Sequence, residues 1–445
     1  MKDEHKHTLE RVNQIWVDEG VSLHRNYLDG RTGGIRLFLS FKNAHKLKFS
    51  NQVLDTAEMV GAQLTETDFT DASLARVNLF GADLTSADMR GCSLEKSDLR
   101  GVCLENADLE GASLSSADIR NGFILVRKPD GSYVPVKNDE TTSLDGINLK
   151  DADLSDAKLG RVIGRRTNLT NVNFKNADLT GAVMANSDVS GSVFTGADLT
   201  NADFSGCVFH GANLSGALLN NTNLEGADLT AAHFNNNDMN YASTLDASLP
   251  KSIEALDRTL RDILEEHMLW INSLGRKGAQ ANLSKYDLQA TDLAGINLQA
   301  AEISFTNLSN CTFLASRLNM ANLTSVMALN SDFSDADMRG IKLEKANLTG
   351  ASLRHSRLSP MTILGTQGNK VAANLKNCCL DQSDLENADL SHADLSGARI
   401  RLANLTNANL SNAKCVDVDF TGADLRSANL EGTDLRGCKG LILSQ

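Results

Sequence analysis

Apolar residues recur at every fifth position along most of this chain. Residues 81–119 read GADLTSADMRGCSLEKSDLRGVCLENADLEGASLSSADI, with Leu, Met or Ile at each fifth position from Leu84 to Ile119. Two residues before each of them stands a small or medium-sized side chain, such as Ala82 or Cys92. The residue between these two is usually Asp, Asn or Ser, and the two residues that follow are mostly polar or Gly. Each repeat therefore has two apolar positions and three polar ones.

A period of five residues fits neither an α-helix, which repeats every 3.6 residues, nor a flat strand, which repeats every two. It requires a chain that turns a corner once in every repeat. The central Leu and the small residue two before it then face inward together, because residues i and i−2 share one face of a strand. The frequent Gly, Asn, Asp and Ser suit the corners. The pattern predicts an all-β solenoid.

The repeat runs through four stretches, with roughly sixty pentapeptides in all. Its central residues run over 54–119, 149–239, 283–363 and 375–435. Within the second stretch, Phe174, Phe194 and Phe234 lie at multiples of twenty residues, with Leu214 in the missing place. This spacing predicts that four pentapeptides complete one coil, so that these side chains stack in one column.

The repeated unit is similar to the A(D/N)LXX motif of the pentapeptide-repeat family, over about seven-tenths of the chain. The resemblance implies a right-handed, quadrilateral parallel β-helix with four pentapeptides per coil. It also bears on function, because some members of that family protect DNA gyrase from quinolones or inhibit it. Those members are acidic rods that resemble B-DNA in width and charge.

The first interruption is 120–146, RNGFILVRKPDGSYVPVKNDETTSLDG. Two β-prone arms flank a Pro-Asp-Gly turn, which predicts a hairpin or an ordered loop that projects from the coil. The segment is either a tolerated insertion or a recognition arm, since loops on rigid scaffolds often carry binding residues. As a recognition arm, it offers Arg127, Lys128, Asp130 and Tyr133 as candidate partner-binding residues.

Two smaller irregularities also break the pattern. In GRVIGRR, residues 160–166, Gly164 stands where a Leu is expected, which predicts a bulged corner. The neighbouring basic residues are further candidates for partner binding: Arg161, Arg165 and Arg166. GTQGNKVAAN, residues 365–374, shifts the frame of the repeat and predicts a corner loop.

Residues 241–281 interrupt the repeat with apolar residues at helical spacing. They predict an α-helix over 251–273, with Pro250 at its start and Gly275 at its end. Setting Trp270 on Trp16 aligns ILEEHMLWINSLG with LERVNQIWVDEG near the N-terminus. The alignment predicts two modules, each a capping helix followed by a β-helix, because an open solenoid end needs cover. Trp16 and Trp270 are the predicted capping residues.

These patterns together divide the chain into four predicted parts. Residues 1–50 are a lead-in or cap with a short helix. Residues 51–240 form the first β-helix, and residues 241–281 form a helical linker or cap. Residues 282–440 form the second β-helix. The apolar tail in RGCKGLILSQ suits a cap or a small self-contact, so a homodimer is one option.

Charge narrows the range of partners. The chain has a net charge of −13, and residues 54–119 carry 13 acidic and 4 basic side chains, a net charge of −9. Residues 1–53 are mildly basic, and residues 283–363 are neutral. Direct nucleic-acid binding needs a basic face, so we do not expect it. We find no apolar run long enough to span a membrane and no secretory signal, and we expect a bacterial protein in a reducing cytosol.

Sequence motifs for catalysis are absent from the chain. It has no GxxxxGK[ST], GxGxxG after a strand, HExxH or GxSxG sequence. Its eight cysteines form no CxxC pair, and most of them occupy the apolar positions of the repeat, which predicts structural thiols. His267 lies on the predicted helix and is read as a cap or core residue rather than a base. We expect no catalytic residue, no metal site and no cofactor.

The sequence thus predicts a non-catalytic scaffold that binds another protein through its faces or through the arm at 120–146. The alternative, drawn from the family resemblance, is an acidic DNA mimic that binds DNA gyrase or another topoisomerase. Two features depart from those family members, because the third stretch is neutral and the repeats are interrupted. A third class, an effector or membrane-associated protein, has only the mildly basic first fifty residues in its favour.

Overall fold

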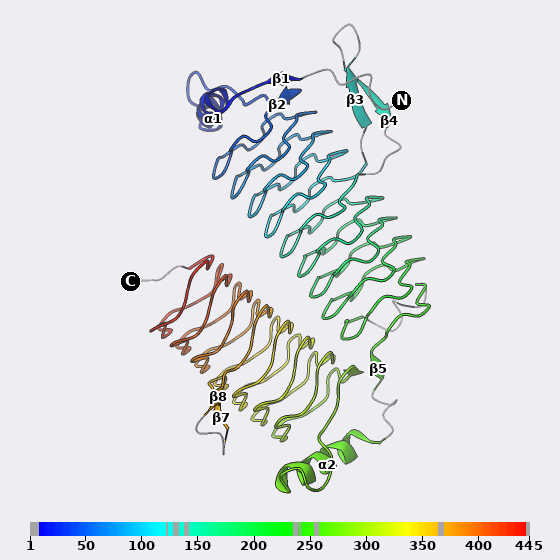
Figure 1. Cartoon of the computed structure of the whole chain (residues 1–445), viewed down its shortest axis with the longest axis vertical. Coiled ribbons are helices and arrows are strands. Elements are labelled where there is room, and N and C mark those ends of the chain that lie inside the picture. Colours follow the sequence, from blue (N-terminus) through cyan, green and yellow to red (C-terminus); the bar gives the residue numbers. More distant parts are fainter. Residues whose placement is uncertain are drawn as a thin grey trace. The chain divides into compact units, whose positions relative to one another are not determined.

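The computed structural model describes residues 9–121, 142–234, 242–252, 258–363 and 369–441, with Met239 and the main chain of 123–127 and 133–137. Two helices and eight short strands lie within these residues (Figure 1). In chain order they are β1 (Glu10–Arg11), α1 (Gln14–Leu28), β2 (Lys42–Asn43), β3 (Phe123–Arg127), β4 (Tyr133–Lys137), β5 (Lys251–Ser252), α2 (Leu260–Asn272), β6 (Tyr286–Asp287), β7 (Met361–Thr362) and β8 (Lys370–Val371).

Most of the chain is held together by single parallel bridges between residues twenty positions apart. Phe38 pairs with Glu58, and Asn43, five residues further on, pairs with Gln63. Each bridge has two hydrogen bonds, one in each direction between the coils. The N–H of Leu39 donates to the carbonyl of Glu58 at 2.7 Å, and the N–H of Glu58 donates to the carbonyl of Leu37 at 3.1 Å. One coil therefore takes twenty residues and carries four bridges. The predicted β-solenoid is confirmed as a repeat-based β-helix.

Apolar side chains fill the interior of each coil and stack in columns with those of the adjacent coils. The rings of Phe174 and Phe194 stack with their centroids 4.9 Å apart, as their twenty-residue spacing predicts. Polar residues fit the small inward position where they donate to a carbonyl of the preceding coil. The hydroxyl of Thr222 reaches the carbonyl of Leu199 at 2.8 Å, and the thiol of Cys207 reaches Met184 at 3.0 Å. Ser, Thr and Cys can therefore replace Ala there without leaving a buried donor unpaired.

The corners explain the polar positions of the repeat. The Asp or Asn before the central residue accepts a hydrogen bond from the main chain two residues on, as Asp68 does from Thr70 at 3.0 Å. This Asx turn starts the corner. The corner ends on a residue with positive φ, such as Asn171 at 58° or Gly191 at 69°, where Asn, Asp and Gly are the least strained residues.

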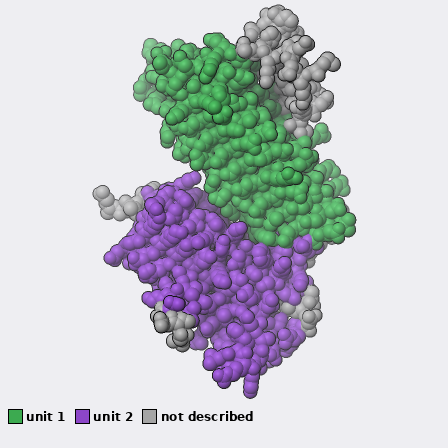
Figure 2. Space-filling model, viewed as in Figure 1, with its two compact units in different colours: residues 1–228, 234–247 green, residues 229–233, 248–445 purple. Residues whose placement is uncertain are grey.

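The chain divides into two compact units, which Figure 2 shows in different colours. The first comprises residues 1–228 and 234–247, and the second comprises residues 229–233 and 248–445. The first coil begins earlier than the sequence predicts, because parallel bridges start at Phe38 and not after residue 50. Residues 37–50 therefore belong to the β-helix and not to the lead-in.

The interruptions at 120–146 and 365–374 leave the stacking of the coils intact. Asp108 pairs with Asn148, forty residues on, so the first interruption inserts the length of one coil. Its strands β3 and β4 pair antiparallel with Arg127 opposite Tyr133, which agrees with the predicted hairpin. Lys342 pairs with Asn374, and β7 pairs antiparallel with β8 in that second insertion.

The structure corrects the predicted course of the chain in two places. Gly164 does not form a bulge, because the bridges on both sides of it are regular and it occupies an ordinary buried central position. A Cβ atom there would lie 3.0 Å from the Sδ atom of Met184 and 3.1 Å from the Cβ atom of Leu144, so these neighbours fill the space of the missing Leu. Helix α2 begins at Leu260 rather than 251, since Lys251–Ser252 is strand β5 and Thr259 is the N-cap.

Candidate functional site

The predicted arm residues are only partly within the described chain. Arg127 and Tyr133 are opposite one another in β3 and β4, where the structure gives the main chain only. Lys128 and Asp130 lie outside the described residues. The arginines of the GRVIGRR segment are all exposed: Arg161, Arg165 and Arg166. They lie around two consecutive corners of one coil, and their role in binding a partner stays a prediction.

Helix α1 covers the start of the first β-helix through hydrogen bonds to its main chain. β1 pairs in parallel with β2 and so provides a hydrogen-bonding partner for the main chain on the second side of the first coil. His24 is fully buried, and its Nδ1 accepts the main-chain N–H of Leu37 at 3.0 Å, while its Nε2 lies 3.0 Å from the carbonyl oxygen of Asp55. The side-chain amide of Gln14 donates to the carbonyl of Lys48 at 2.8 Å and accepts its N–H at 2.9 Å. A side-chain amide thus replaces the missing neighbouring strand.

Helix α2 repeats this arrangement at the start of the second β-helix. β5 pairs in parallel with β6, and the fully buried His267 accepts the N–H of Ala281 on Nδ1 at 3.0 Å. Its Nε2 has no hydrogen-bond partner among the described residues, apart from a weak interaction with the main chain of Gln299, the counterpart of Asp55. Burial lowers the pKa of both histidines. Each helix therefore caps a coil through a neutral, buried histidine.

The two histidines show that the residues of α1 and α2 correspond differently from the predicted alignment on tryptophan. His24 stacks on Tyr27 with centroids 5.8 Å apart, and His267 stacks on Trp270 at 5.7 Å. Trp270 thus corresponds to Tyr27, and Trp16 lies near the other end of its helix. Trp270 is half-buried beside the capping histidine, whereas Trp16 is 41% exposed and follows the N-cap Asn13. The shared signature is His-x-x-aromatic, which sequence reasoning missed.

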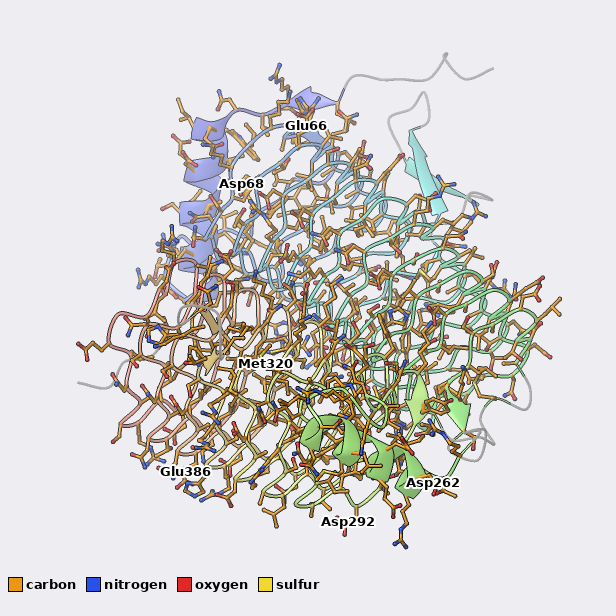
Figure 3. The ribbon with its side chains drawn as sticks, turned by 60° about the horizontal axis from the view of Figure 1, so that its bottom comes forward. Glu66, Asp68, Asp262, Asp292, Met320 and Glu386 are labelled. Atoms are coloured by element: carbon orange, nitrogen blue, oxygen red, sulfur yellow. The ribbon has the colours of Figure 1, made fainter. Side chains whose placement is uncertain are left out.

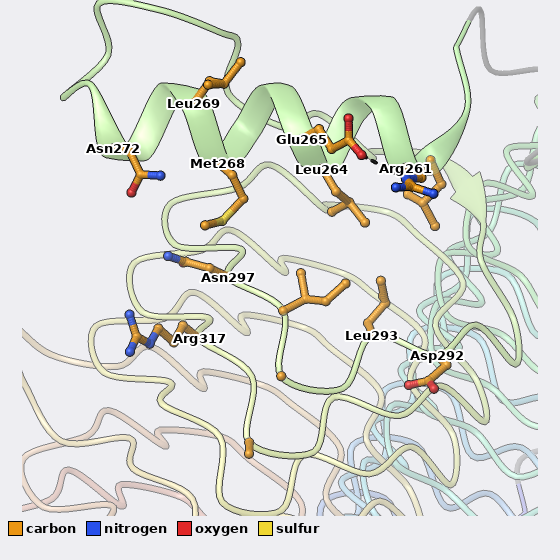
Figure 4. A pocket seen from close by; sticks show the side chains of 14 residues that line it. Arg261, Leu264, Glu265, Met268, Leu269, Asn272, Asp292, Leu293, Asn297 and Arg317 are labelled. Carbon is orange, nitrogen blue, oxygen red and sulfur yellow. Dashed lines mark hydrogen bonds and ion pairs between the residues drawn. The ribbon is translucent and has the colours of Figure 1, made fainter.

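A groove of about 1020 Å³ lies between α2 and the first coils of the second β-helix (Figure 4). On the coil side, Leu260, Ile263 and Leu264 pack against the apolar core. Further along α2, Met268 and Leu269 are 38% and 51% exposed. The helix lines one wall with residues that include Leu260, Leu264, Met268 and Leu269. The coils line the other wall with Asp292, Leu293, Gly295, Ile296, Asn297, Ala315 and Arg317.

The rim of this groove is polar. Arg261 and Glu265 form an ion pair at 2.8 Å on α2, one helical turn apart. The side chain of Arg317 lies below the helix near Asn297, and Asp292 lies at the opposite end (Figure 4). An apolar floor with polar groups of both signs around it is a typical binding site for an amphipathic chain or ligand.

The acidic first stretch forms columns of carboxylates along the outside of the coils. Asp68, Asp88 and Asp108 occupy the same bridge position in three successive coils, and Figure 3 labels Asp68 and its neighbour Glu66. Arg90 donates to Asp88 at 2.5 Å and lies 3.7 Å from Asp108, so it relieves the repulsion between two carboxylates of the column. Its side-chain hydrogen bond lowers the pKa of Asp88.

The cysteines are free thiols, and most of them are buried in the coil interior. Burial raises the pKa of Cys92, Cys207 and Cys415 to about 12 and that of Cys311 to about 11. They are protonated at neutral pH and are poor nucleophiles. Within the described ranges, no cluster of three or more His, Cys, Asp or Glu residues is arranged to hold a metal ion. No described helix has the length and apolarity needed to cross a membrane.

The profile of the family described as pentapeptide repeats matches well over half of the chain. It covers residues 57–95, 92–122, 147–186, 173–211, 207–243, 279–313, 331–359, 371–407 and 403–439. The chain belongs to the pentapeptide-repeat family. The described parts of the matched segments lie in the stacked coils, and α1 and α2 lie outside the matched segments.

Solved structures of other pentapeptide-repeat proteins resemble the chain at low sequence identity. QnrB1, a plasmid-mediated fluoroquinolone resistance protein, is 20% identical over 46% of this chain and 88% of its own, with a TM-score of 0.19. HetL from Nostoc sp. strain PCC 7120, a protein involved in regulating heterocyst differentiation, is 20% identical over 94% and 97%, with a TM-score of 0.17. Rfr23 from Cyanothece 51142 is 20% identical over 34% and 90%, with a TM-score of 0.19.

At these values the likeness carries no conclusion about function. A search of curated protein sequences found no match. Three features of this chain lie outside the regular coils: two histidine-capped helices, the hairpin of β3 and β4, and the groove beneath α2. No sequence signal marks the groove, because it depends on how far α2 lies from the coil.

Proposed function

We propose that this chain is a non-catalytic scaffold that binds a partner protein. It would consist of two right-handed, four-sided β-helical modules, each led by a capping helix. The observation that carries the proposal is the groove beneath α2, where Met268 and Leu269 remain exposed beside the coil. Exposed apolar groups framed by polar ones mark sites of protein association. The buried, protonated thiols offer no nucleophile, and the free cysteines suit a reducing cytoplasm.

Affinity capture with the purified full-length chain tests this function. We expect one or a few proteins to co-purify in a fixed ratio, and each to bind again when purified, because a scaffold holds its partner without consuming it. Three baits locate the contact: the full chain, a chain lacking 122–141, and the Met268→Glu variant. Loss of binding only without 122–141 would assign the contact to the hairpin. Failure of every bait to bind a purified candidate would contradict the scaffold function.

The second candidate is an acidic mimic of DNA that binds DNA gyrase or another topoisomerase. It is favoured by the stretch 54–119, with its net charge of −9 and its columns of aspartates. Against it, Asp88, Asp98 and Asp118 are each paired to an arginine two residues on, which lowers the outward negative charge. A supercoiling assay decides the matter. Micromolar protein should inhibit gyrase or protect it from a quinolone, and no effect on either reaction would exclude this candidate.

A further inference from the structure

In the first coil of the second β-helix, the main-chain groups of Asp292 beside the apolar groove have no hydrogen-bond partner among the described residues. At each bridge between the first and second coils, the second coil bonds two main-chain groups of the first coil. They are the carbonyl of the residue before the bridged residue and the N–H of the residue after it. The second coil thus takes the carbonyl of Thr291 and the N–H of Leu293. Asp292, between them, therefore directs its own N–H and carbonyl to the opposite side, where a preceding coil would lie. Within the described part of the chain, neither group has a hydrogen-bond partner.

The first β-helix shows what this edge accepts. Lys48 occupies the place in its first coil that Asp292 occupies in the second β-helix. There, both main-chain groups of Lys48 are bonded by the side-chain amide of Gln14, at 2.8 and 2.9 Å. An amide donates one hydrogen bond and accepts another, as a peptide group does. A peptide-like group on the side where a preceding coil would lie can therefore bond both main-chain groups of this edge.

The helices also differ in how closely they approach the coil. Val17 and Val21 of α1 are 0% and 7% exposed, which leaves that helix tightly packed on its coil. Their counterparts by the histidine register, Leu260 and Leu264, are only partly buried, although both are larger side chains. α2 thus lies further from its coil. Asp292, whose main-chain groups have no partner among the described residues, lines the resulting groove together with Met268 and Ile296.

We propose that this groove binds an extended, apolar segment of a partner protein, which pairs in parallel with the edge at Asp292 as an added strand. The segment's main chain would accept the N–H of Asp292 and donate to its carbonyl. Its inward side chains would continue the columns that begin at Leu293 and Ile296, and contact Met268. This is the β-strand addition by which exposed sheet edges bind peptides. The inference rests on the scaffold function proposed above and names the site and the chemistry of its partner.

A strand fits the observations better than a helix or a small apolar molecule. A helix bonds its own main-chain groups and would leave Asp292 unpaired, and a hydrocarbon has no donor or acceptor for it. An unpaired polar group that loses water beneath a ligand weakens the binding of that ligand. A strand avoids this cost and fills the apolar space as well.

The test uses the purified full-length protein and a synthetic peptide that copies residues 309–319, with Ala in place of Cys311. These residues cover the same two sides one coil further on, so the peptide carries side chains already shaped for the columns. Fluorescence anisotropy with a labelled peptide measures binding. We expect saturable binding by the wild type. Met268→Glu should weaken it by about tenfold or more, because a charge would enter the apolar wall.

The matched control on the protein is Leu274→Glu, the same kind of substitution at a residue that is 85% exposed just beyond α2 and does not line the groove. It should bind as the wild type does. The matched control on the peptide is N-methylation at the position of Phe313, which keeps every side chain but removes the donor to Asp292. It should weaken binding about tenfold, the value of one or two hydrogen bonds.

Three outcomes would overturn the strand site. N-methylation without effect would show that the main chain does not pair. Equal binding by Met268→Glu and the wild type would place the peptide elsewhere. Binding of the apolar dye anilinonaphthalene sulfonate, blocked by Met268→Glu, without any peptide binding would reassign the groove to small apolar ligands. The scaffold function itself fails only in the capture experiment, where partner binding through the hairpin would support it even if the groove binds no strand.

Discussion

Replacing Phe194 by Ala should lower the free energy of unfolding by about 3 to 5 kcal/mol, the largest single effect that we expect in this chain. Phe194 is fully buried in the first unit. Its ring stacks on Phe174 at 4.9 Å and meets Phe204 and Phe209 at 5.8 and 6.0 Å. Its N–H also donates to Asn213 of the next coil at 2.7 Å, so the main chain is fixed on that side and cannot move inward to fill the cavity.

Two variants separate the cavity from other causes. Phe194→Leu should cost much less, because the next residue in the column is already a buried leucine, Leu214. Leu218→Ala, at a side chain that is 52% exposed on the next coil, should change stability by no more than about 0.5 kcal/mol. Urea unfolding and hydrogen exchange measure all three. A cost for Phe194→Ala near that of Leu218→Ala would show that the coil interior relaxes freely.

The coils could be predicted from the sequence because every repeat meets the same surroundings. The central residue, the small inward residue and the Asx turn each depend on contacts within one coil or between adjacent coils. A local pattern therefore specifies the structure, and the ring column through Phe174 and Phe194 follows from counting alone. The prediction fails at the first coil, Phe38 to Val53, for a physical reason. Lys42 takes the small inward position there and pairs with Glu10 of β1, because a lead-in strand and a helix, not another coil, cover that end.

The capping helices were harder to predict because their decisive contacts are polar. The alignment on tryptophan compared the apolar residues of two amphipathic helices. Such patterns match one another in more than one register, so they do not fix which residues correspond. The contact that fixes each helix is a single histidine nitrogen on a main-chain N–H, at His24 and His267. The start of α2 was missed for a similar reason. Lys251–Ser252 carries a helical pattern but forms β5, since the second side of the first coil needs a strand partner.

The same two histidines predict a loss of stability at mildly acidic pH. In each, Nδ1 accepts a main-chain N–H and must be unprotonated, so a proton on that nitrogen would oppose the N–H of Leu37 or Ala281. Burial lowers the folded-state pKa of both, below the value of about 6.5 for an exposed histidine. For His24, the charges of Arg36 and Asp55 act in opposite directions and are smaller effects than burial.

The sign follows from proton binding. Below pH 6.5 the unfolded chain takes up protons on these residues while the folded chain does not, so protons favour unfolding. The two histidines contribute fully to the free energy of unfolding above about pH 6.5, and this contribution falls as the pH drops towards their folded-state pKa. The slope is at most about 1.4 kcal/mol per pH unit for each histidine. Aspartates with a lowered pKa, such as Asp88 and Asp337, lose their contribution only below about pH 4, so a loss of stability between pH 6.5 and pH 4 does not come from them.

The double variant His24→Asn, His267→Asn isolates the effect. An asparagine amide oxygen can accept the N–H of Leu37 or Ala281 in place of Nδ1, and it does not titrate. It should be less stable than the wild type at pH 7.5, because it lacks the rings that stack on Tyr27 and Trp270. Between pH 7 and 5, however, its stability should fall less steeply. His233, whose pKa burial also lowers, is the same in both proteins and cancels in the comparison.

Urea unfolding at a series of pH values gives the slopes, and an NMR titration of the imidazole nitrogens reports the two caps directly. In the folded protein, both rings should keep the neutral tautomer with hydrogen on Nε2 at pH values below 6.5, where an exposed histidine is protonated. Parallel slopes for the wild type and the double variant would contradict the assignment of the acid sensitivity to the caps. Different slopes would show that each β-helix depends on one neutral histidine to close its first coil, because among the described residues the N–H of Leu37 or Ala281 has no other acceptor.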